Sequence, residues 1–218
     1  RLWIPEHHAI EICHDKWKFY EFLKSEGFAT PQTFLSGKIN NSLPFPLIAK
    51  PRRGEGSKNL FRVEDYGDLD FYMKKCPQHV FQQHVEGQEF SVDCFFDQDG
   101  LPRLIVPRKR LMVRGGEVMV SRIHMDSAIM NAVEELGVKL GLTGPCTIQG
   151  IQDPVGKFYF TDANLRFGSG FVHTISAGGD VPLQMYKELG GQELDAHRPE
   201  IREHSVMTRF PESIFHHE

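Results

Sequence analysis

With 218 residues, of which 40% are hydrophobic, the chain is long enough to bury one large core or two small ones, which excludes general disorder. Its formal net charge of −4 gives no general attraction to nucleic acid or to acidic membranes, so an anionic ligand must be held by a local group of cations. The sequence has no apolar run long enough for a membrane span, and its four cysteines are widely spread without a C-x-x-C pair. We therefore expect a cytoplasmic protein with reduced thiols and no nucleic-acid or membrane partner.

The first predicted element is a helix over residues 15–27. Asp15 can cap its start, Phe19 and Leu23 belong to one apolar face, and Gly27 supplies the stop. The Thr-Pro pair that follows this helix predicts that the chain turns into extended structure.

Strands follow, recognised by short apolar runs or by alternation of apolar and polar residues. They are predicted at residues 45–50, 80–85, 89–97, 101–106, 147–152 and 157–162. A second helix is predicted over 126–140, with Ile129, Val133 and Leu136 on one side and Gly141 as its stop. Because the helices are separated by antiparallel hairpins, the predicted class is α+β.

A basic, glycine-containing segment comes directly after the strand that ends on Lys50. Arg52, Arg53 and Lys58 surround Gly54-Glu55-Gly56-Ser57, and glycines allow backbone N–H groups to turn toward a phosphate that the cations neutralise. The alternative is an ordinary solvated loop with scattered charge. Taken alone, the G-x-G-S pattern favours this alternative, because such short patterns recur by chance.

A second candidate site combines oxygen donors near the end of the last hairpin. Asp162 and Asn164 are two residues apart, so in an extended chain they face the same side, and Arg166 continues that row. Gln149 lies on the opposite strand. Carboxylate and amide oxygens are ligands that Mg²⁺ prefers, and an arginine can hold a phosphate oxygen. Spacing alone is equally compatible with a polar surface stripe, but the glycines of 168–170, which permit close approach of a ligand, favour a site.

A third group of cations, Arg108-Lys109-Arg110, has two interpretations. A solvated run of charge is the default, and a cationic wall facing a transferred phosphate is the functional alternative. The histidines near the start of the chain lack the H-E-x-x-H spacing of a zinc site.

The order of these signals resembles the ATP-grasp superfamily, in particular the large subunit of carbamoyl-phosphate synthase and related carboxylate–amine ligases. The resemblance rests on Asp15-Lys16 at a helix start, Ile48-Ala49-Lys50-Pro51 before a G-x-G-S loop, F-Q-Q-H-V-x-G-x-E over 81–89, and D-x-N-x-R over 162–166. It extends from about residue 15 to about residue 190. It implies a fold of two lobes with antiparallel sheets and the nucleotide between them.

The resemblance also implies a set of ATP-binding positions. These are Lys16 and Lys50 for the phosphates, Gly54, Gly56 and Ser57 in the loop that folds over them, Gln83, His84 and Val85 for adenine, and Glu89 for the ribose. Asn59 stands where a glycine is common in the family.

For the metal and the chemistry, the resemblance implies two further groups. Gln149, Asp162 and Asn164 match the Mg²⁺ ligands, with Mn²⁺ as a substitute; Arg166 matches the arginine beside the acyl-phosphate, and Arg108 and Arg110 the basic pair that faces the γ-phosphate and the substrate carboxylate. The family usually carries Glu at the position of Asp162, which is one methylene shorter.

The activity implied is that of an ATP-dependent ligase, in which a carboxylate becomes an acyl-phosphate that an amine or ammonia attacks. The alternatives are a non-catalytic or regulatory ATP-binding module and a protein-interaction domain. The expected organisation has a remnant or linker over 1–14, a first lobe over 15–85, a second lobe over 86–195 and an extension over 196–218. A separate N-terminal domain or a homodimer is expected as a partner, beside the small-molecule carboxylate and amine.

Overall fold

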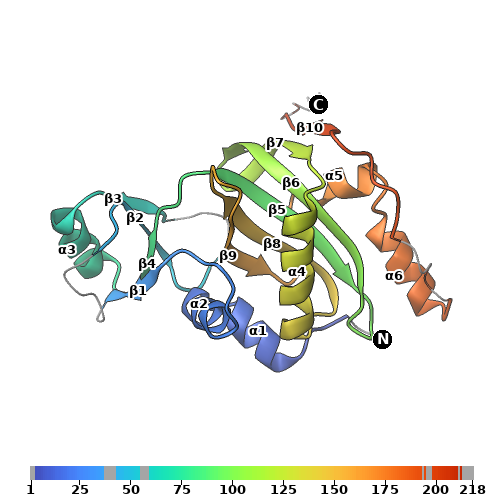
Figure 1. The fold of residues 1–218 in the computed structure, drawn as a ribbon, viewed down its shortest axis with the longest axis horizontal. Helices are drawn as coiled ribbons and strands as arrows, with labels where there is room; N and C mark the ends of the chain where they lie inside the picture. The colour runs from blue at the N-terminus through green and yellow to red at the C-terminus, as the bar shows by residue number, and fades with distance from the viewer. Residues whose placement is uncertain are drawn as a thin grey trace, which may run out of the picture.

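Two antiparallel sheets and the helices that pack on them make up the computed structural model (Figure 1). The residues that the structure describes are 3–36, 43–54, 59–192, 194, 198–210 and 212. The strand order is β1-β4-β2-β3 in the four-stranded sheet and β10-β7-β6-β5-β8-β9 in the six-stranded sheet. This confirms the predicted α+β class with two antiparallel sheets.

The smaller sheet forms the first part of the molecule and carries one helix. Its elements are β1 (Thr33–Leu35), β2 (Leu47–Pro51), β3 (Phe61–Val63), α3 (Tyr66–Lys75) and β4 (His79–Gln83). Their core consists of Phe34, Leu47, Ala49, Val63, Leu69 and Phe81. The side chain of Leu47 at the centre of the sheet is fully buried, which fits the predicted apolar strand that ends near Lys50.

The larger sheet forms the second part. Its strands are β5 (Gln88–Phe96), β6 (Pro102–Arg114), β7 (Glu117–Ile123), β8 (Gly144–Gln152), β9 (Phe158–Asn164) and β10 (Val206–Thr208). The helices around it are α1 (His7–Cys13), α2 (Lys16–Ser25), α4 (Ser127–Leu140), α5 (Phe171–Ser176) and α6 (Val181–Leu189).

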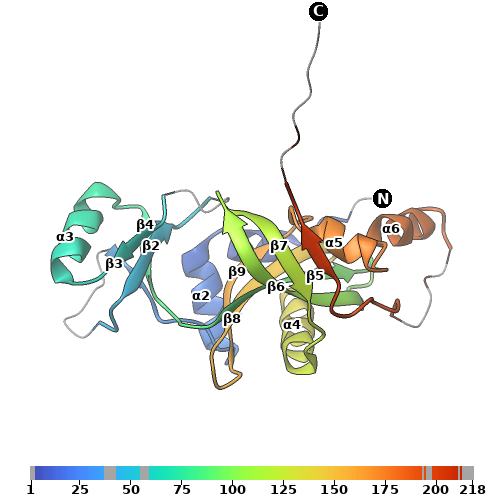
Figure 2. The same cartoon turned by 90° about the horizontal axis from the view of Figure 1, so that it is seen from above.

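The two faces of this sheet are covered by different helices. Helix α4 packs on the face of Phe90 and Val92, whereas α5 packs through Phe171 on the face of Phe95. Figure 2 shows α4 below the sheet and α5 beside its other face. Both faces of β5 are therefore buried, although its sequence alternates between apolar and more polar residues.

Helix α4 confirms the prediction made from its apolar stripe. The Asp126 carboxylate accepts hydrogen bonds from the backbone N–H groups of Ala128 and Ile129, so it satisfies donors that the first turn leaves free. Gly141 ends the helix with a left-handed backbone (φ +62°), a conformation that glycine adopts without strain.

Helix α2 starts at Asp15, as predicted, because this carboxylate accepts from the N–H groups of Trp17 and Lys18. Its buried Phe19 and Leu23 pack into the core of the larger sheet, not into that of the smaller one. Helix α1 joins the same core through Ala9 and Cys13. The predicted boundaries at residues 14, 85 and 195 remain a proposal.

The four cysteines are free, and Cys13, Cys94 and Cys146 are buried, as expected for reduced thiols. Within the described part of the chain, none of the helices has the length and apolar character that crossing a membrane requires.

Candidate functional site

A row of polar side chains crosses the larger sheet on the face that α5 covers. Arg108 on β6 pairs with Ser91 on β5, Ser91 pairs with Gln149 on β8, and Gln149 pairs with Asp162 on β9. Directly paired residues of an antiparallel sheet place their side chains on the same face. The register therefore puts residues from four strands side by side.

A second row lies next to the first. Asp93 pairs with Thr147, and Thr147 pairs with Asn164. Asn164 follows Asp162 by two residues on β9, so both point to the same face, and Gln149 is the cross-strand neighbour of Asp162. The three predicted metal ligands are thus brought together on one face by two adjacent strands.

A β-bulge interrupts the hairpin of β8 and β9 at this point. Gln149 pairs with Asp162, but Gly150 pairs with Phe160, which leaves Thr161 as the extra residue. The carbonyl oxygen of Thr161 accepts a hydrogen bond from Lys50 Nζ at 3.2 Å. The bulge therefore directs a backbone oxygen toward Lys50 on β2 of the smaller sheet, a feature that residue types alone could not predict.

Two lysines from the first part of the chain converge on this edge of the sheet. Lys16 Nζ lies 3.5 Å from a carboxylate oxygen of Asp162 and donates a 2.9 Å hydrogen bond to the carbonyl of Gly54. Lys50 is buried, and burial lowers the pKa of its ammonium group from 10.5 to about 8; Asp162 opposes this shift and Lys16 adds to it. Cations and oxygen donors are therefore concentrated around Asp162.

The start of the glycine-containing loop is fixed to helix α2. Arg52 Nε donates to both carboxylate oxygens of Asp15, at 2.7 and 2.9 Å, while the Lys16 N–H donates to the Arg52 carbonyl. Burial alone would raise the pKa of Asp15, but the hydrogen bonds from Arg52 and the helix N–H groups hold it below its ordinary value. Gly54 has φ +134°, a conformation that strains other residues, whereas the predicted Gly56 and Ser57 lie outside the described residues.

Arg108 is buried beneath the loop that precedes α5 instead of facing solvent. Its guanidinium donates to both carboxylate oxygens of Asp93, at 2.7 and 3.0 Å. Thr147 and Thr174 also donate to this carboxylate, at 3.1 and 2.6 Å. The remaining Nη1 has no hydrogen-bond partner among the described residues and lies 2.6 Å from where a Cβ on Gly170 would be, so a larger residue at position 170 would require the guanidinium to shift. The default interpretation of 108–110 as a solvated charge run is wrong for Arg108.

Arg110 lies two residues further along β6 and pairs with the predicted ribose residue. Its Nη1 is 3.0 Å from a carboxylate oxygen of Glu89, whose side chain is 51% exposed. Burial lowers the pKa of Arg110, Glu89 opposes this shift, and Arg108 adds to it. Glu89 thus stands at the rim of the site with a carboxylate that solvent can reach.

The segment that joins the two sheets contains the predicted adenine residues. Gln83 ends β4, and its N–H donates to the Gln32 carbonyl at 2.7 Å. The His84 N–H donates to the Pro46 carbonyl at 3.0 Å, and Val85 follows on the way to β5. Backbone hydrogen bonds therefore hold this connection in place between the sheets.

Arg166 does not continue the strand row as predicted, because β9 ends at Asn164 and the chain bends. Its guanidinium is exposed and donates to the Phe167 carbonyl at 3.0 Å. Gly168 then returns to the sheet, where its N–H donates to the Thr147 hydroxyl. The structure therefore places Arg166 at the edge of the polar rows.

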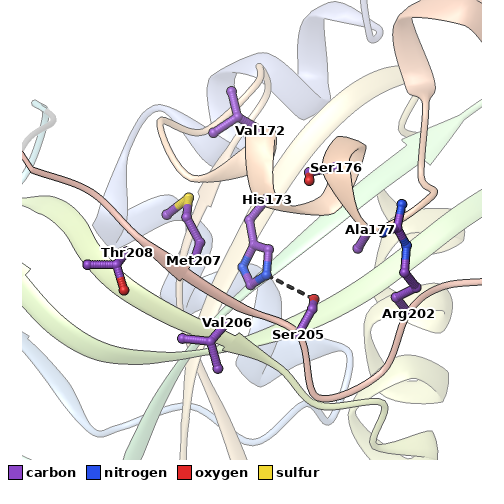
Figure 3. Close-up of a pocket in the computed structure, with 9 residues that line it drawn as sticks. All are labelled: Val172, His173, Ser176, Ala177, Arg202, Ser205, Val206, Met207 and Thr208. Carbon is purple, nitrogen blue, oxygen red and sulfur yellow. Dashed lines mark hydrogen bonds between the residues drawn. The ribbon is translucent and has the colours of Figure 1, made fainter.

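A cavity of about 410 Å³ lies elsewhere, between α5 and the segment that contains β10 (Figure 3). His173 lies in its wall, with hydrogen bonds to Ser121 at 2.8 Å and to Ser205 at 3.0 Å. Burial lowers the pKa of His173, Arg108 adds to this effect and Asp93 opposes it. Among the described residues, none of the predicted site residues lines this cavity.

Comparison with known proteins places this geometry in context. At the level of sequence, the chain is 23% identical over 150 residues to a carbamoyl-phosphate synthase from Methanobrevibacter smithii, which covers 66% of this chain and 36% of that protein. It is 25% identical over 145 residues to a D-alanine–D-alanine ligase from Petrotoga mobilis, which covers 58% of this chain and 48% of that protein. The chain therefore spans less than half the length of these two relatives.

At the level of structure, the chain is similar to biotin carboxylase from Campylobacter jejuni in a β,γ-ATP complex. The TM-score is 0.79 at 18% identity, and the match covers 94% of this chain and 52% of that one. This likeness shows the shared fold. A family model described as an ATP-grasp domain matches residues 13–170. Because this match covers more than half of the chain, the chain belongs to the ATP-grasp family.

Proposed function

We propose that this chain binds Mg·ATP between its two sheets and is the nucleotide-binding part of an ATP-dependent ligase that activates a carboxylate. The observation that carries the proposal is the convergence of Lys16 and Lys50 on Asp162, which stands in a row of oxygen donors. Polyphosphate requires fixed cations, and its metal ion requires hard oxygen ligands. Both are present at one edge of the larger sheet.

The nucleotide is proposed to lie along the connection between the sheets. Val85 and its neighbours would contact adenine, and the exposed carboxylate of Glu89 would accept hydrogen bonds from the ribose. Lys16 and Lys50 would hold the phosphates. The loop that begins at Gly54 would cover them, and its anchored start at Arg52 and Asp15 gives it a fixed hinge.

The side chains at the metal position fit Mg²⁺ in their chemistry. Asp162, Asn164 and Gln149 offer one carboxylate and two amide oxygens from adjacent strands on one face. The Asp162 carboxylate already pairs with a cation, because Lys16 Nζ lies 3.5 Å from one of its oxygens. When bound, Mg²⁺ would neutralise phosphate charge and orient the γ-phosphate.

The proposed reaction transfers the γ-phosphoryl group of ATP to a carboxylate oxygen and releases ADP. An amine nitrogen would then attack the carbonyl carbon of the acyl-phosphate, so that a C–N bond forms and phosphate leaves. Such a transfer depends on positioning and on fixed positive charge. Lys50 and Arg166 would supply charge near the phosphates, and the Asp93-anchored Arg108 would supply it beneath the loop at Gly170.

The two sequence relatives support this type of reaction, because one is named a carbamoyl-phosphate synthase and the other a D-alanine–D-alanine ligase. A carbamoyl-phosphate synthase-like reaction is the more specific form of the proposal. A small carboxylate and an amine or ammonia are the substrates that it requires.

The proposal is tested by Asp162→Asn, which keeps the shape of the side chain and removes its charge. We expect calorimetric titration with Mg²⁺ and a non-hydrolysable ATP analogue to show binding at least about tenfold weaker than in wild type, because a hard metal loses its charged ligand. ADP release with candidate carboxylates should fall in parallel.

The matched control is Asp99→Asn, which removes an exposed carboxylate at the hairpin between β5 and β6. It should bind the nucleotide as wild type does. If Asp162→Asn and wild type bound Mg²⁺ and the ATP analogue with equal affinity and melted alike, the assignment of Asp162 as a metal ligand would be wrong. Nucleotide binding without ADP release from any substrate would instead indicate a regulatory module.

A further inference from the structure

Two histidines and a glutamate meet on the opposite side of the larger sheet from Asp162. His124 directly follows β7, and Glu203 and His204 lie just before β10. One ligand atom from each of them lies within 4.8 Å of the other two. The His124 ring packs near Phe90, at 6.2 Å between ring centroids, and Phe90 belongs to the face that α4 covers. This cluster is therefore separate from the nucleotide site.

The backbone holds the two histidine-bearing segments side by side. The Ile123 N–H donates to the Ser205 carbonyl at 3.0 Å, and the His204 N–H donates to the Ile123 carbonyl at 3.2 Å. Beyond these bonds, β10 continues as an antiparallel partner of β7. His204 is thus hydrogen-bonded to Ile123, the residue directly before His124, so the backbones that carry the two histidines are held together and little chain entropy is lost when a ligand joins them.

The donor types select a class of ion. Two imidazole nitrogens and one carboxylate oxygen are a ligand set of zinc and of related first-row divalent ions, and three protein ligands leave a coordination position for water. Magnesium prefers the oxygen donors around Asp162 instead. Asp126 also lies close enough to His124 for a charge interaction, which adds negative charge beside the cluster.

We propose that His124, Glu203 and His204 form a binding site for a divalent transition-metal ion of the zinc class. The ion joins the end of β7 to the turn before β10. The same turn provides Arg202 and Ser205, which line the cavity beside His173. The ion therefore holds in place a segment that contributes to one wall of that cavity.

The test uses Co²⁺ as a spectroscopic probe and Zn²⁺ as its competitor, with the full chain prepared without a histidine tag. His216 and His217 are first replaced by Asn, because two adjacent histidines could bind the ion themselves. We expect one equivalent of Co²⁺ to give visible absorption bands of low-symmetry coordination, which one equivalent of Zn²⁺ removes. Zn²⁺ should also raise the melting temperature, since an ion bound only to the folded state stabilises it.

The variants are chosen so that loss of binding can be separated from loss of folding. His204→Asn keeps a residue that tolerates the left-handed backbone found there (φ +64°), and Glu203→Gln changes an exposed side chain. We expect each to weaken Co²⁺ binding at least about tenfold and to abolish the Zn²⁺-dependent rise, while the melting temperature without metal stays close to that of wild type.

Two controls complete the experiment. His8→Asn removes another exposed histidine, whose Nδ1 lies 3.4 Å from a carboxylate oxygen of Glu6. This variant should still bind one equivalent of Co²⁺. Asp162→Asn should retain it too, because the two sites are separate. Absence of a saturable Co²⁺ spectrum in the starting protein would overturn the proposal, and so would an unchanged spectrum in His204→Asn and Glu203→Gln.

Discussion

At the scale of single residues, Lys50 connects burial to phosphate binding. Its ammonium is buried between the sheets, and its pKa is lowered to about 8 against 10.5 in an exposed lysine. From about pH 8 to pH 10.5 the unfolded chain therefore binds more protons here than the folded protein does. The contribution of Lys50 to the unfolding free energy rises with pH in this window, and its burial cost is fully present below it.

Phosphate binding should reverse this shift, because a nearby anion favours the charged ammonium. We predict that at pH 8.5 binding of Mg²⁺ and a non-hydrolysable ATP analogue takes up protons at Lys50. Calorimetry in two buffers of different ionisation enthalpy measures the uptake, and Lys50→Arg, which stays charged, should lose it. Equal proton uptake in both proteins would show that Lys50 does not contact the phosphates.

The buried pair of Asp93 and Arg108 makes a prediction about stability. Asp93→Asn keeps the size of the side chain but leaves the buried Arg108 guanidinium without its counter-ion. We expect a loss of about 3–5 kcal/mol in unfolding free energy by chemical denaturation. The exposed Asp99→Asn should change it by less than about 0.5 kcal/mol. A small effect at Asp93 would mean that the guanidinium reaches solvent or another anion.

Residue types and spacing predicted part of the site. The grouping of Asp162, Asn164 and Gln149 follows from strand periodicity and one hairpin, which are local in the sequence. The partnership of Asp93 with Arg108 depends on β6 continuing past residue 106, where the predicted strand ends, and on a bulge in its pairing with β5. The bond from Thr174 depends on the position of α5, which spacing does not encode. For the same reason Arg108 looked like part of a solvated charge run.

At the scale of elements, helix α4 owes its fit to the sheet to one glycine. A Cβ on Gly137 would lie 2.1 Å from the Phe96 ring, and both residues are buried. We predict that Gly137→Ala destabilises the protein by about 1–3 kcal/mol, although alanine is the better helix former. Asn131→Ala, at an exposed position of the same helix, should be neutral or slightly stabilising. Thermal unfolding of both variants decides whether packing or helix propensity controls this position.

Elements with strong local signals were the ones that could be predicted. Helix α4 has an apolar stripe of several turns with a cap at each end, and the β8–β9 hairpin has a turn rich in proline and glycine. Helix α5 has six residues and β10 has three, too short for a period to emerge. These short elements exist through tertiary contacts, such as the pairing of β10 with β7.

At the scale of the whole molecule, strand β9 of the larger sheet contacts β2 of the smaller sheet and the segment that leads into β1 through a few specific hydrogen bonds near the site. The Thr30 hydroxyl donates to the Phe160 carbonyl, the Phe160 N–H donates to the Ala29 carbonyl, and Lys50 donates to Thr161. The resemblance of the motifs predicted two lobes with the nucleotide between them. It did not predict that α2 packs on the larger sheet, because an apolar stripe does not specify which sheet it covers.

The central claim is that Mg·ATP binds between these sheets, and the melting temperature tests it most directly. A ligand held about 100-fold above its Kd that binds only the folded chain adds about 2.7 kcal/mol, which corresponds to about 5–10 °C for a protein of this size. We predict such a rise with Mg²⁺ plus a non-hydrolysable ATP analogue, and a smaller one when Mg²⁺ is omitted. An unchanged melting temperature at millimolar nucleotide and Mg²⁺ would contradict the proposed nucleotide site.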